Sequence, residues 1–215
     1  MVKKPGVRGD AVGYPDTFPG APMTRALVLY AHPLADSFAA ALHDTVVGTL
    51  KGRGWEVDDC DLYAEGFDPV LSAQERTQYH DVATNTAPVA DHVARLRAAT
   101  ALVLCFPVWN FGYPAILKGY FDRVFLPGVS FRLEGGKVVP NLTHIDKLAA
   151  VTTYGGSRAR AVFAGDPPRN VIKRALWHVT RPEKLRYIAL YDMNRAPADR
   201  RAAFLAQVRR EMESF

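Results

Sequence analysis

The sequence is poor in cysteine, and it has no long hydrophobic run. Cys60 and Cys105 are the only cysteines among its 215 residues, and both lie in apolar, strand-like segments. Two such thiols fit neither a disulfide framework nor the spacing of metal ligands, so we expect buried, reduced thiols in a cytoplasmic protein. No apolar run approaches the roughly 20 residues that cross a bilayer. No apolar core follows Lys3, Lys4 and Arg8 either, which argues against a secretory signal.

Several catalytic and nucleotide-binding motifs are also absent. The chain has no Gly-x-Gly-x-x-Gly fingerprint of dinucleotide-binding folds and no Gly-x-x-x-x-Gly-Lys-[Ser/Thr] phosphate loop, which disfavours nucleoside triphosphate chemistry of that type. It has no serine nucleophile elbow. Five histidines show no His-x-x-x-His pattern and no carboxylate grouping along the sequence, so we predict no metal site. They are His43, His80, His92, His144 and His178.

Positive charge exceeds negative charge only modestly. The formal net charge is +5, and its local excess lies between Gly156 and Trp177. A solvated surface and a positive rim that attracts phosphate-bearing ligands both account for such an excess. No nucleic-acid-binding motif or regular basic stripe accompanies it, which argues against a nucleic-acid partner. The basic residues of this stretch are Arg158, Arg160, Arg169, Lys173 and Arg174.

Apolar runs alternate with helical patterns after residue 24. Residues 1–24 are rich in glycine and proline and predict an extended arm, whereas residues 25–215 predict one α/β domain. Short apolar runs typical of strands covered on both faces occur at 26–31, 55–63, 101–105, 147–153 and 185–190. Helical spacing occurs at 38–50, 89–98, 114–125, 168–179 and 197–214, with one or two helical turns near 73–79 and a hairpin at 129–139.

Five strands interleaved with helices predict a doubly wound parallel sheet. The order 2-1-3-4-5 is the common arrangement for five strands, and it places the switch point between the first and third strands. Ligands bind such sheets at the carboxyl ends of the strands around this point. The site is therefore predicted in the loops 32–38, 106–113 and 153–158, which are the three segments of unusual composition.

The loop after the third strand is the most informative of these. It reads Phe-Pro-Val-Trp-Asn-Phe-Gly-Tyr-Pro over residues 106–114. The rings of Trp109, Phe111 and Tyr113 beside two prolines form a stiff, flat wall that suits a planar heteroaromatic cofactor, and we interpret it as a flavin site. Packing of Trp109 and Phe111 in the core is the alternative.

The loop after the first strand leads into a helix. A helix start offers unpaired N–H groups and the positive end of the helix dipole, both of which suit a phosphate. Ser37 can add a hydroxyl donor, and His32 can reach the same anion as a donor or a cation. A turn histidine and an ordinary helix cap are the alternative.

These segments together resemble the NAD(P)H:quinone oxidoreductases of flavodoxin-like fold. The resemblance spans about residues 25–160. It rests on Ala-His-Pro-x-x-x-Ser-Phe at 31–38, on Phe-Pro at 106–107 with Phe-Gly-Tyr-Pro-Ala-Ile-Leu-Lys-Gly-Tyr-Phe-Asp-Arg-Val-Phe at 111–125, and on Thr-Thr-Tyr-Gly-Gly at 152–156. It implies a homodimeric flavoenzyme that carries two electrons as hydride from NAD(P)H through flavin N5 to quinones or to azo and nitroaromatic acceptors.

The resemblance also implies which residues hold the flavin. Its phosphate would lie on His32, Ser37, Phe38 and Ala39, and its ring along Pro107, Val108, Trp109, Asn110 and Phe111 and along Thr153, Tyr154, Gly155 and Gly156. Backbone N–H groups of the last two segments can hydrogen-bond the ring edge. Gly155 and Gly156 permit a close backbone approach that a Cβ would block, and a plain turn at these glycines is the alternative.

The chain departs from the animal quinone reductases around the ring. Those enzymes carry Gln-Trp where this chain has Trp109-Asn110, and Tyr154 is inserted before the two glycines. Both features are similar to the FMN-dependent azoreductases, so FMN is favoured over FAD. The Tyr and His that are proposed to relay a proton after Gly-Gly in the animal enzymes have no counterpart here. Tyr154 is then a candidate proton donor, and no catalytic residue is assigned.

Two other functions fit a flavoprotein of this kind. A non-enzymatic electron carrier is disfavoured, because such carriers are usually acidic and hold the FMN phosphate on a Ser/Thr-Gly-rich first loop, whereas this chain is basic and has His32-Pro33 there. A regulatory subunit of a membrane potassium-efflux system stays open, since an ancillary flavoprotein of that system also resembles this family. The choice between NADH and NADPH stays open as well.

Overall fold

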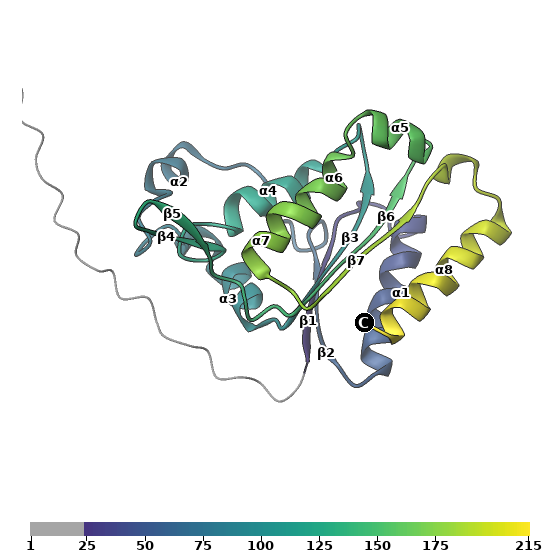
Figure 1. Ribbon diagram of the computed structural model, residues 1–215, viewed down its shortest axis with the longest axis horizontal. Helices are drawn as coiled ribbons and strands as arrows, with labels where there is room; N and C mark the ends of the chain where they lie inside the picture. Colours follow the sequence, from purple (N-terminus) through teal and green to yellow (C-terminus); the bar gives the residue numbers. More distant parts are fainter. Residues whose placement is uncertain (1–23) are drawn as a thin grey trace, which may run out of the picture.

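Five parallel strands form one sheet in the order β2-β1-β3-β6-β7 (Figure 1). The strands are β1 (Arg25–Tyr30), β2 (Glu56–Asp61), β3 (Ala101–Val108), β6 (Lys147–Tyr154) and β7 (Lys184–Leu190). Counted within the sheet this is the order 2-1-3-4-5, which confirms the predicted topology. The computed structural model describes residues 24–215, so the arm expected over residues 1–24 lies, except for its last residue, outside the described residues.

Helices cover both faces of the sheet (Figure 1). On one face lie α1 (Phe38–Gly52) and α8 (Ala198–Glu213). On the other lie α3 (Ala90–Ala98), α4 (Ala115–Val124) and a run made of α6 (Pro167–Asn170), η2 (Val171–Leu176) and α7 (Trp177–Thr180). The shorter elements are α2 (Ala73–Gln78), η1 (Ala87–Val89), α5 (Arg158–Phe163) and η3 (Met193–Arg195). No helix within residues 24–215 is long and apolar enough to cross a membrane.

The central strands are buried on both faces, as their continuous apolar composition predicts. In β1, Leu27 and Leu29 belong to the core on the α3 side, whereas Ala26 and Val28 belong to the core on the α1 side. This alternation follows from the two-residue period of a strand. The same layers bury Cys60 and Cys105, and both thiols are free.

The predicted hairpin is confirmed beside the sheet. Strands β4 (Phe131–Glu134) and β5 (Lys137–Pro140) pair antiparallel. The two residues between them, Gly135 and Gly136, have φ angles of 55° and 77°. Such a pair of left-handed residues closes a two-residue hairpin with the right-handed twist of its strands.

Two details differ from the sequence expectation. The helix predicted over 168–179 has π-helical turns through η2 in its middle, so it is not one regular α-helix. In addition, α5 follows the fourth strand of the sheet directly, where the sequence predicts only a loop. Its start is fixed by Ser157, whose Oγ accepts a hydrogen bond from the Arg160 N–H at 3.3 Å, a cap that a single serine signals only weakly.

Candidate functional site

The three loops predicted to form the site meet at the carboxyl ends of adjacent strands β1, β3 and β6. The ring of His32, after β1, lies edge-on to Trp109, after β3, with ring centroids 5.7 Å apart. A cavity of about 360 Å³ lies between the β3 and β6 loops. Its lining residues are Val108, Asn110, Phe111, Tyr154, Gly155, Gly156, Ser157, Arg160, Ala161 and Asn194. The topology therefore unites segments that are more than 100 residues apart in the sequence.

A tight reversal at residues 109–112 shapes one wall of the cavity. The Trp109 N–H donates to the Gly112 carbonyl at 3.1 Å, and the Gly112 N–H donates to the Trp109 carbonyl at 2.8 Å. The two residues between them, Asn110 and Phe111, have left-handed φ angles of 48° and 58°. Asparagine tolerates this conformation, whereas for phenylalanine it costs about 1–2 kcal/mol. Strain of this kind tends to accompany functional sites.

This reversal leaves two N–H donors without a backbone acceptor among the described residues. Among residues 24–215, neither the Asn110 nor the Phe111 N–H donates to another backbone group. The Trp109 and Phe111 rings are 41% and 44% exposed, so they do not belong to the core. The loop thus presents unpaired donors beside exposed aromatic faces.

The opposite wall is the turn after β6. The N–H groups of Gly155 and Gly156 also lack a backbone acceptor within the part of the chain that the structure describes. A Cβ added at Gly155 would lie 2.9 Å from Asn194 Nδ2, which is a tight contact. A Cβ at Gly156 would meet only Arg160 Cδ, at an ordinary 3.7 Å. The protein's own packing therefore does not require glycine at 156, and the glycine instead keeps space open on the cavity side.

The start of α1 holds a further set of donors, and none of its residues lines the cavity. The Ser37 Oγ accepts from the Ala40 N–H at 3.1 Å, which makes Ser37 the helix cap. The N–H groups of Phe38 and Ala39 have no backbone acceptor among the described residues. His32 Nδ1 accepts from the Leu34 N–H at 3.1 Å, so the proton of the neutral ring lies on Nε2. Together these groups can bind an anion through N–H donors and the helix dipole.

Comparison with known protein families agrees with this architecture. The family model described as flavodoxin-like fold matches residues 24–215. The chain belongs to the flavodoxin-like fold family. This confirms the fold expected from the sequence, and ligands bind doubly wound sheets of this kind at the switch point where the three loops meet.

Relatives within this family carry redox names. The NAD(P)H dehydrogenase [quinone] 1 of Rattus norvegicus is 28% identical over 214 residues, which cover 88% of this chain and 77% of that protein. The structure of Smu.1420 from Streptococcus mutans UA159 has a TM-score of 0.81 and 27% identity, and the match covers 89% of this chain and all of that one. An FMN-dependent NADH-azoreductase from Bacillus anthracis, solved with FMN, has a TM-score of 0.69 at 15% identity, covering 89% of this chain and 97% of that one. The last likeness shows the fold alone.

The Tyr154 side chain points into the protein in this family member. Its hydroxyl donates to Asp166 Oδ1 at 2.5 Å and lies 2.5 Å from the Tyr187 hydroxyl. Burial raises the pKa of Tyr154, and the hydrogen bond to Asp166 raises it further. A hydroxyl held in this way is not directed at a ring in the cavity. Tyr154 therefore lines the cavity while its hydroxyl anchors the turn.

A polar network that the sequence does not reveal holds this anchor. Arg169 Nε donates to Asp166 Oδ2 at 2.9 Å, and its Nη2 donates to the Tyr191 hydroxyl at 2.7 Å. The Tyr154 and Tyr191 rings stack with centroids 4.5 Å apart. The network joins the turn after β6 to the start of α6 and to the end of β7. Its members are far apart in the sequence, and no motif marks Asp166, Tyr187, Tyr191 or Asn194.

The remaining predicted residues have different positions. Pro107 and Thr153 lie opposite each other within β3 and β6 and do not line the cavity. Of the basic stretch, Arg160 lines the cavity. Arg169, by contrast, is bound to Asp166 and so belongs to the structural network. The basic stretch therefore contributes one arginine to the cavity lining and another to the hydrogen-bond network that holds the turn.

Proposed function

We propose that this protein is a flavin-dependent NAD(P)H:quinone oxidoreductase. It transfers two electrons, as hydride, from NAD(P)H to quinones or to related azo and nitroaromatic acceptors. One observation carries the proposal. Asn110, Phe111, Gly155 and Gly156, on two turns, line one cavity, and their four backbone N–H groups have no backbone acceptor among the described residues. A flat ring with polar atoms along its edge matches this arrangement of donors.

The anionic tail of the cofactor is assigned to the start of α1. The N–H groups of Phe38 and Ala39 and the His32 Nε2–H are donors without a described acceptor there. Phosphate binding at such a helix start is a general property of helices. These donors suit the phosphate of FMN, and with Trp109-Asn110 and Tyr154 they support FMN over FAD.

The protein's part in the reaction is orientation and electrostatics. Held by residues 110–111 and 155–156, a flavin would supply two-electron hydride chemistry that links NAD(P)H oxidation to acceptor reduction. The backbone N–H groups of these residues would stabilise negative charge on it. Phe111, which is 44% exposed, lines one side of the cavity. Arg160 at the cavity margin attracts the phosphates of the donor nucleotide.

The proposal includes a homodimer in the cytoplasm. A second cavity of about 540 Å³, almost wholly apolar, lies between α4 and the 167–179 run and includes Tyr113, Phe121 and Val171. Apolar surface of this kind supports association with a second chain. Two buried free thiols fit a reducing compartment.

The test begins with purified full-length protein. Released cofactor is separated against FMN and FAD standards, and NADH and NADPH oxidation is followed with and without a quinone. We expect yellow protein with FMN, acceptor-dependent oxidation and the parallel-line kinetics of two half-reactions. Light scattering reports the dimer separately. Protein that takes up neither FMN nor FAD would refute the flavin site, whereas flavin binding without acceptor-dependent turnover would point to the carrier or regulatory alternatives.

A further inference from the structure

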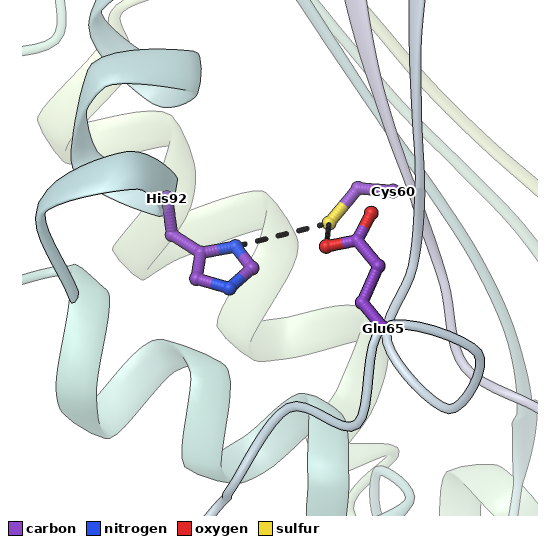
Figure 2. Close-up of side chains that lie close together, drawn as sticks. All are labelled: Cys60, Glu65 and His92. Atoms are coloured by element: carbon purple, nitrogen blue, oxygen red, sulfur yellow. Dashed lines mark hydrogen bonds between the residues drawn. The ribbon is translucent and has the colours of Figure 1, made fainter.

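Three side chains that can ligate a metal ion meet on the α3 side of the sheet (Figure 2). Cys60 lies in β2, Glu65 in the turn that follows β2, and His92 in α3. The Cys60 Sγ lies 3.6 Å from Glu65 Oε2 and 3.9 Å from His92 Nδ1. The three ligand atoms all lie within 4.8 Å of one another. None of these residues lines the cavity described above.

These separations match ligands arranged around one ion. With the usual zinc bond lengths, a tetrahedral site places the thiolate sulfur about 3.6 Å from both the imidazole nitrogen and the carboxylate oxygen. The two distances from sulfur need a shift of only a few tenths of an ångström. The Glu65 oxygen and the His92 nitrogen lie within 4.8 Å and must come to about 3.4 Å on the same ion. Thiolate, imidazole and carboxylate together suit zinc, whereas magnesium and calcium take oxygen ligands.

The charges around the cluster also match a divalent cation. Arg95 donates to both carboxylate oxygens of Glu65, at 2.9 and 2.7 Å, and to Asp58 Oδ1 from two nitrogens, at 2.9 and 2.7 Å. Arg25 also pairs with Asp58 at 3.6 Å and with Glu56 at 3.4 Å, so two arginines against three carboxylates leave a charge of −1. The charge becomes −2 when Cys60 is a thiolate, and a divalent ion neutralises it. Arg95 meanwhile orients Glu65 as an outer-shell partner does.

His92 directs one ring nitrogen at the cluster. Its Nδ1 lies 3.9 Å from the Cys60 Sγ (Figure 2). Its ring is fixed edge-on against Phe67 and Tyr120, with centroids 4.9 and 5.5 Å away. The Glu65 side chain is 33% exposed, which gives an ion a route from solvent.

The hydroxyl of Tyr120 is an independent observation. Tyr120, in α4, is fully buried, and its Oη has no hydrogen-bond partner among residues 24–215. Its ring packs edge-on against His92, with centroids 5.5 Å apart, so Tyr120 lies beside the cluster. An unpaired buried hydroxyl is costly, and a water molecule held on a metal would satisfy it.

We propose that Cys60, Glu65 and His92 bind one Zn²⁺ ion, which keeps a water as its fourth ligand beside the Tyr120 hydroxyl. On binding, the Cys60 S–H bond breaks, a zinc–sulfur bond forms, and one proton leaves to solvent without a change of oxidation state. The ion ties β2, the turn after it and α3 together. Its role is structural, because the flavin-binding residues are elsewhere.

A hydrogen-bonded thiol is the competing explanation. In that case the Cys60 S–H donates to Glu65, which accounts for the 3.6 Å contact. It leaves the Tyr120 hydroxyl unpaired, and it predicts no zinc uptake. The two explanations therefore differ in a stoichiometry that can be measured.

The experiment uses the full-length flavoprotein without a histidine tag. The protein is treated with a chelator, dialysed against micromolar zinc chloride and assayed for zinc by elemental analysis. We expect one zinc per chain in the wild type and in Cys105→Ala, the matched control at the other buried thiol. We expect less than about one-tenth of that in Cys60→Ala and in His92→Gln, both with unchanged flavin content. Protein loaded with cobalt in place of zinc should show a thiolate-to-cobalt absorption band in the difference spectrum against zinc-loaded protein. This band should occur only in proteins that contain Cys60.

A wild-type measurement keeps the test decisive if a variant does not fold. Alkylation of each cysteine is followed by peptide mass spectrometry, with and without zinc. Zinc should slow modification of Cys60 at least tenfold and leave that of Cys105 unchanged. Absence of stoichiometric zinc, full zinc uptake by folded Cys60→Ala, or binding without protection of Cys60 would each overturn the proposal.

Discussion

Replacing Tyr154 by phenylalanine separates an anchoring role from a catalytic one. The change removes one oxygen atom and keeps the ring that stacks on Tyr191. Two hydrogen bonds are lost, the one donated to Asp166 and the one shared with Tyr187. Asp166 is 7% exposed and keeps only its bond from Arg169 among these partners.

The expected loss of stability follows from these two bonds. A hydrogen bond to a charged group contributes about 1.5–3 kcal/mol and a neutral one about 1 kcal/mol. We therefore expect the free energy of unfolding to fall by about 3 kcal/mol. In a domain of this size each kcal/mol lowers Tm by about 2–4 °C, so Tm should fall by about 6–12 °C. The kcat for quinone reduction should change by less than about threefold.

The assay combines urea unfolding with steady-state kinetics across pH. The control is Tyr191→Phe, which removes only the Arg169 contact at 2.7 Å and should cost about 1.5–3 kcal/mol. A proton donor would instead contribute about 10²–10⁴-fold to the rate. A hundredfold loss of kcat with little change in stability would show that Tyr154 acts on the substrate, and the anchoring argument would then be wrong.

Three further predictions concern the loops and the network. Gly156→Val should abolish flavin retention without unfolding the protein, because the added atoms enter the cavity. The control is Gly52→Val, at an open position, which should keep the cofactor. Equal flavin occupancy in the two variants would remove Gly156 from the site. Ser37→Ala should weaken FMN binding about fivefold, which corresponds to about 1 kcal/mol. The control is Ser72→Ala, which removes the cap of α2 instead. An unaltered Kd for FMN in Ser37→Ala would place the phosphate elsewhere. Burial raises the pKa of Tyr154 and of Tyr187 above the ordinary tyrosine value of about 10. Below pH 10 both hydroxyls are protonated in the folded and the unfolded chain, so they should leave the free energy of unfolding constant. Above pH 10 the unfolded chain loses these protons first, so the free energy of unfolding should fall as pH rises, and less steeply in Tyr154→Phe. Urea unfolding at a series of pH values would contradict this if the fall per pH unit were the same in both proteins.

The fold was predictable because its signals are local. Leu27 and Val28 belong to a continuous apolar run, and such a run is typical of a strand with a core on each side. Alternation of strands with helices then allows few topologies. The middle of the 168–179 helix and the short helix α5 were not predicted, because a π-helical turn and a one-serine cap have weak sequence signals.

The candidate site was only partly predictable. Chain positions 109–111 and 155–156 could be assigned from composition and resemblance, because exposed aromatics and paired glycines after buried strands are unusual. The direction of the Tyr154 hydroxyl could not be assigned, since it depends on Asp166 and Tyr187, which lie 12 and 33 residues further along the chain. Likewise, histidine and cysteine spacing predicted no metal ligands, yet the fold brings Cys60, Glu65 and His92 together.

By itself the sequence determined which segments become strands and helices, their order in the sheet, and the loops that gather at its carboxyl edge. These follow from hydrophobic periodicity and the handedness of crossovers, which act along neighbouring parts of the chain. Only the tertiary structure decided the strained turn at Asn110 and Phe111, the Tyr154–Asp166–Arg169 network and the Cys60 cluster. The turn depends on two backbone hydrogen bonds between Trp109 and Gly112. The network and the cluster depend on side chains from separate elements, and the packing of helices against the sheet sets the distances between them.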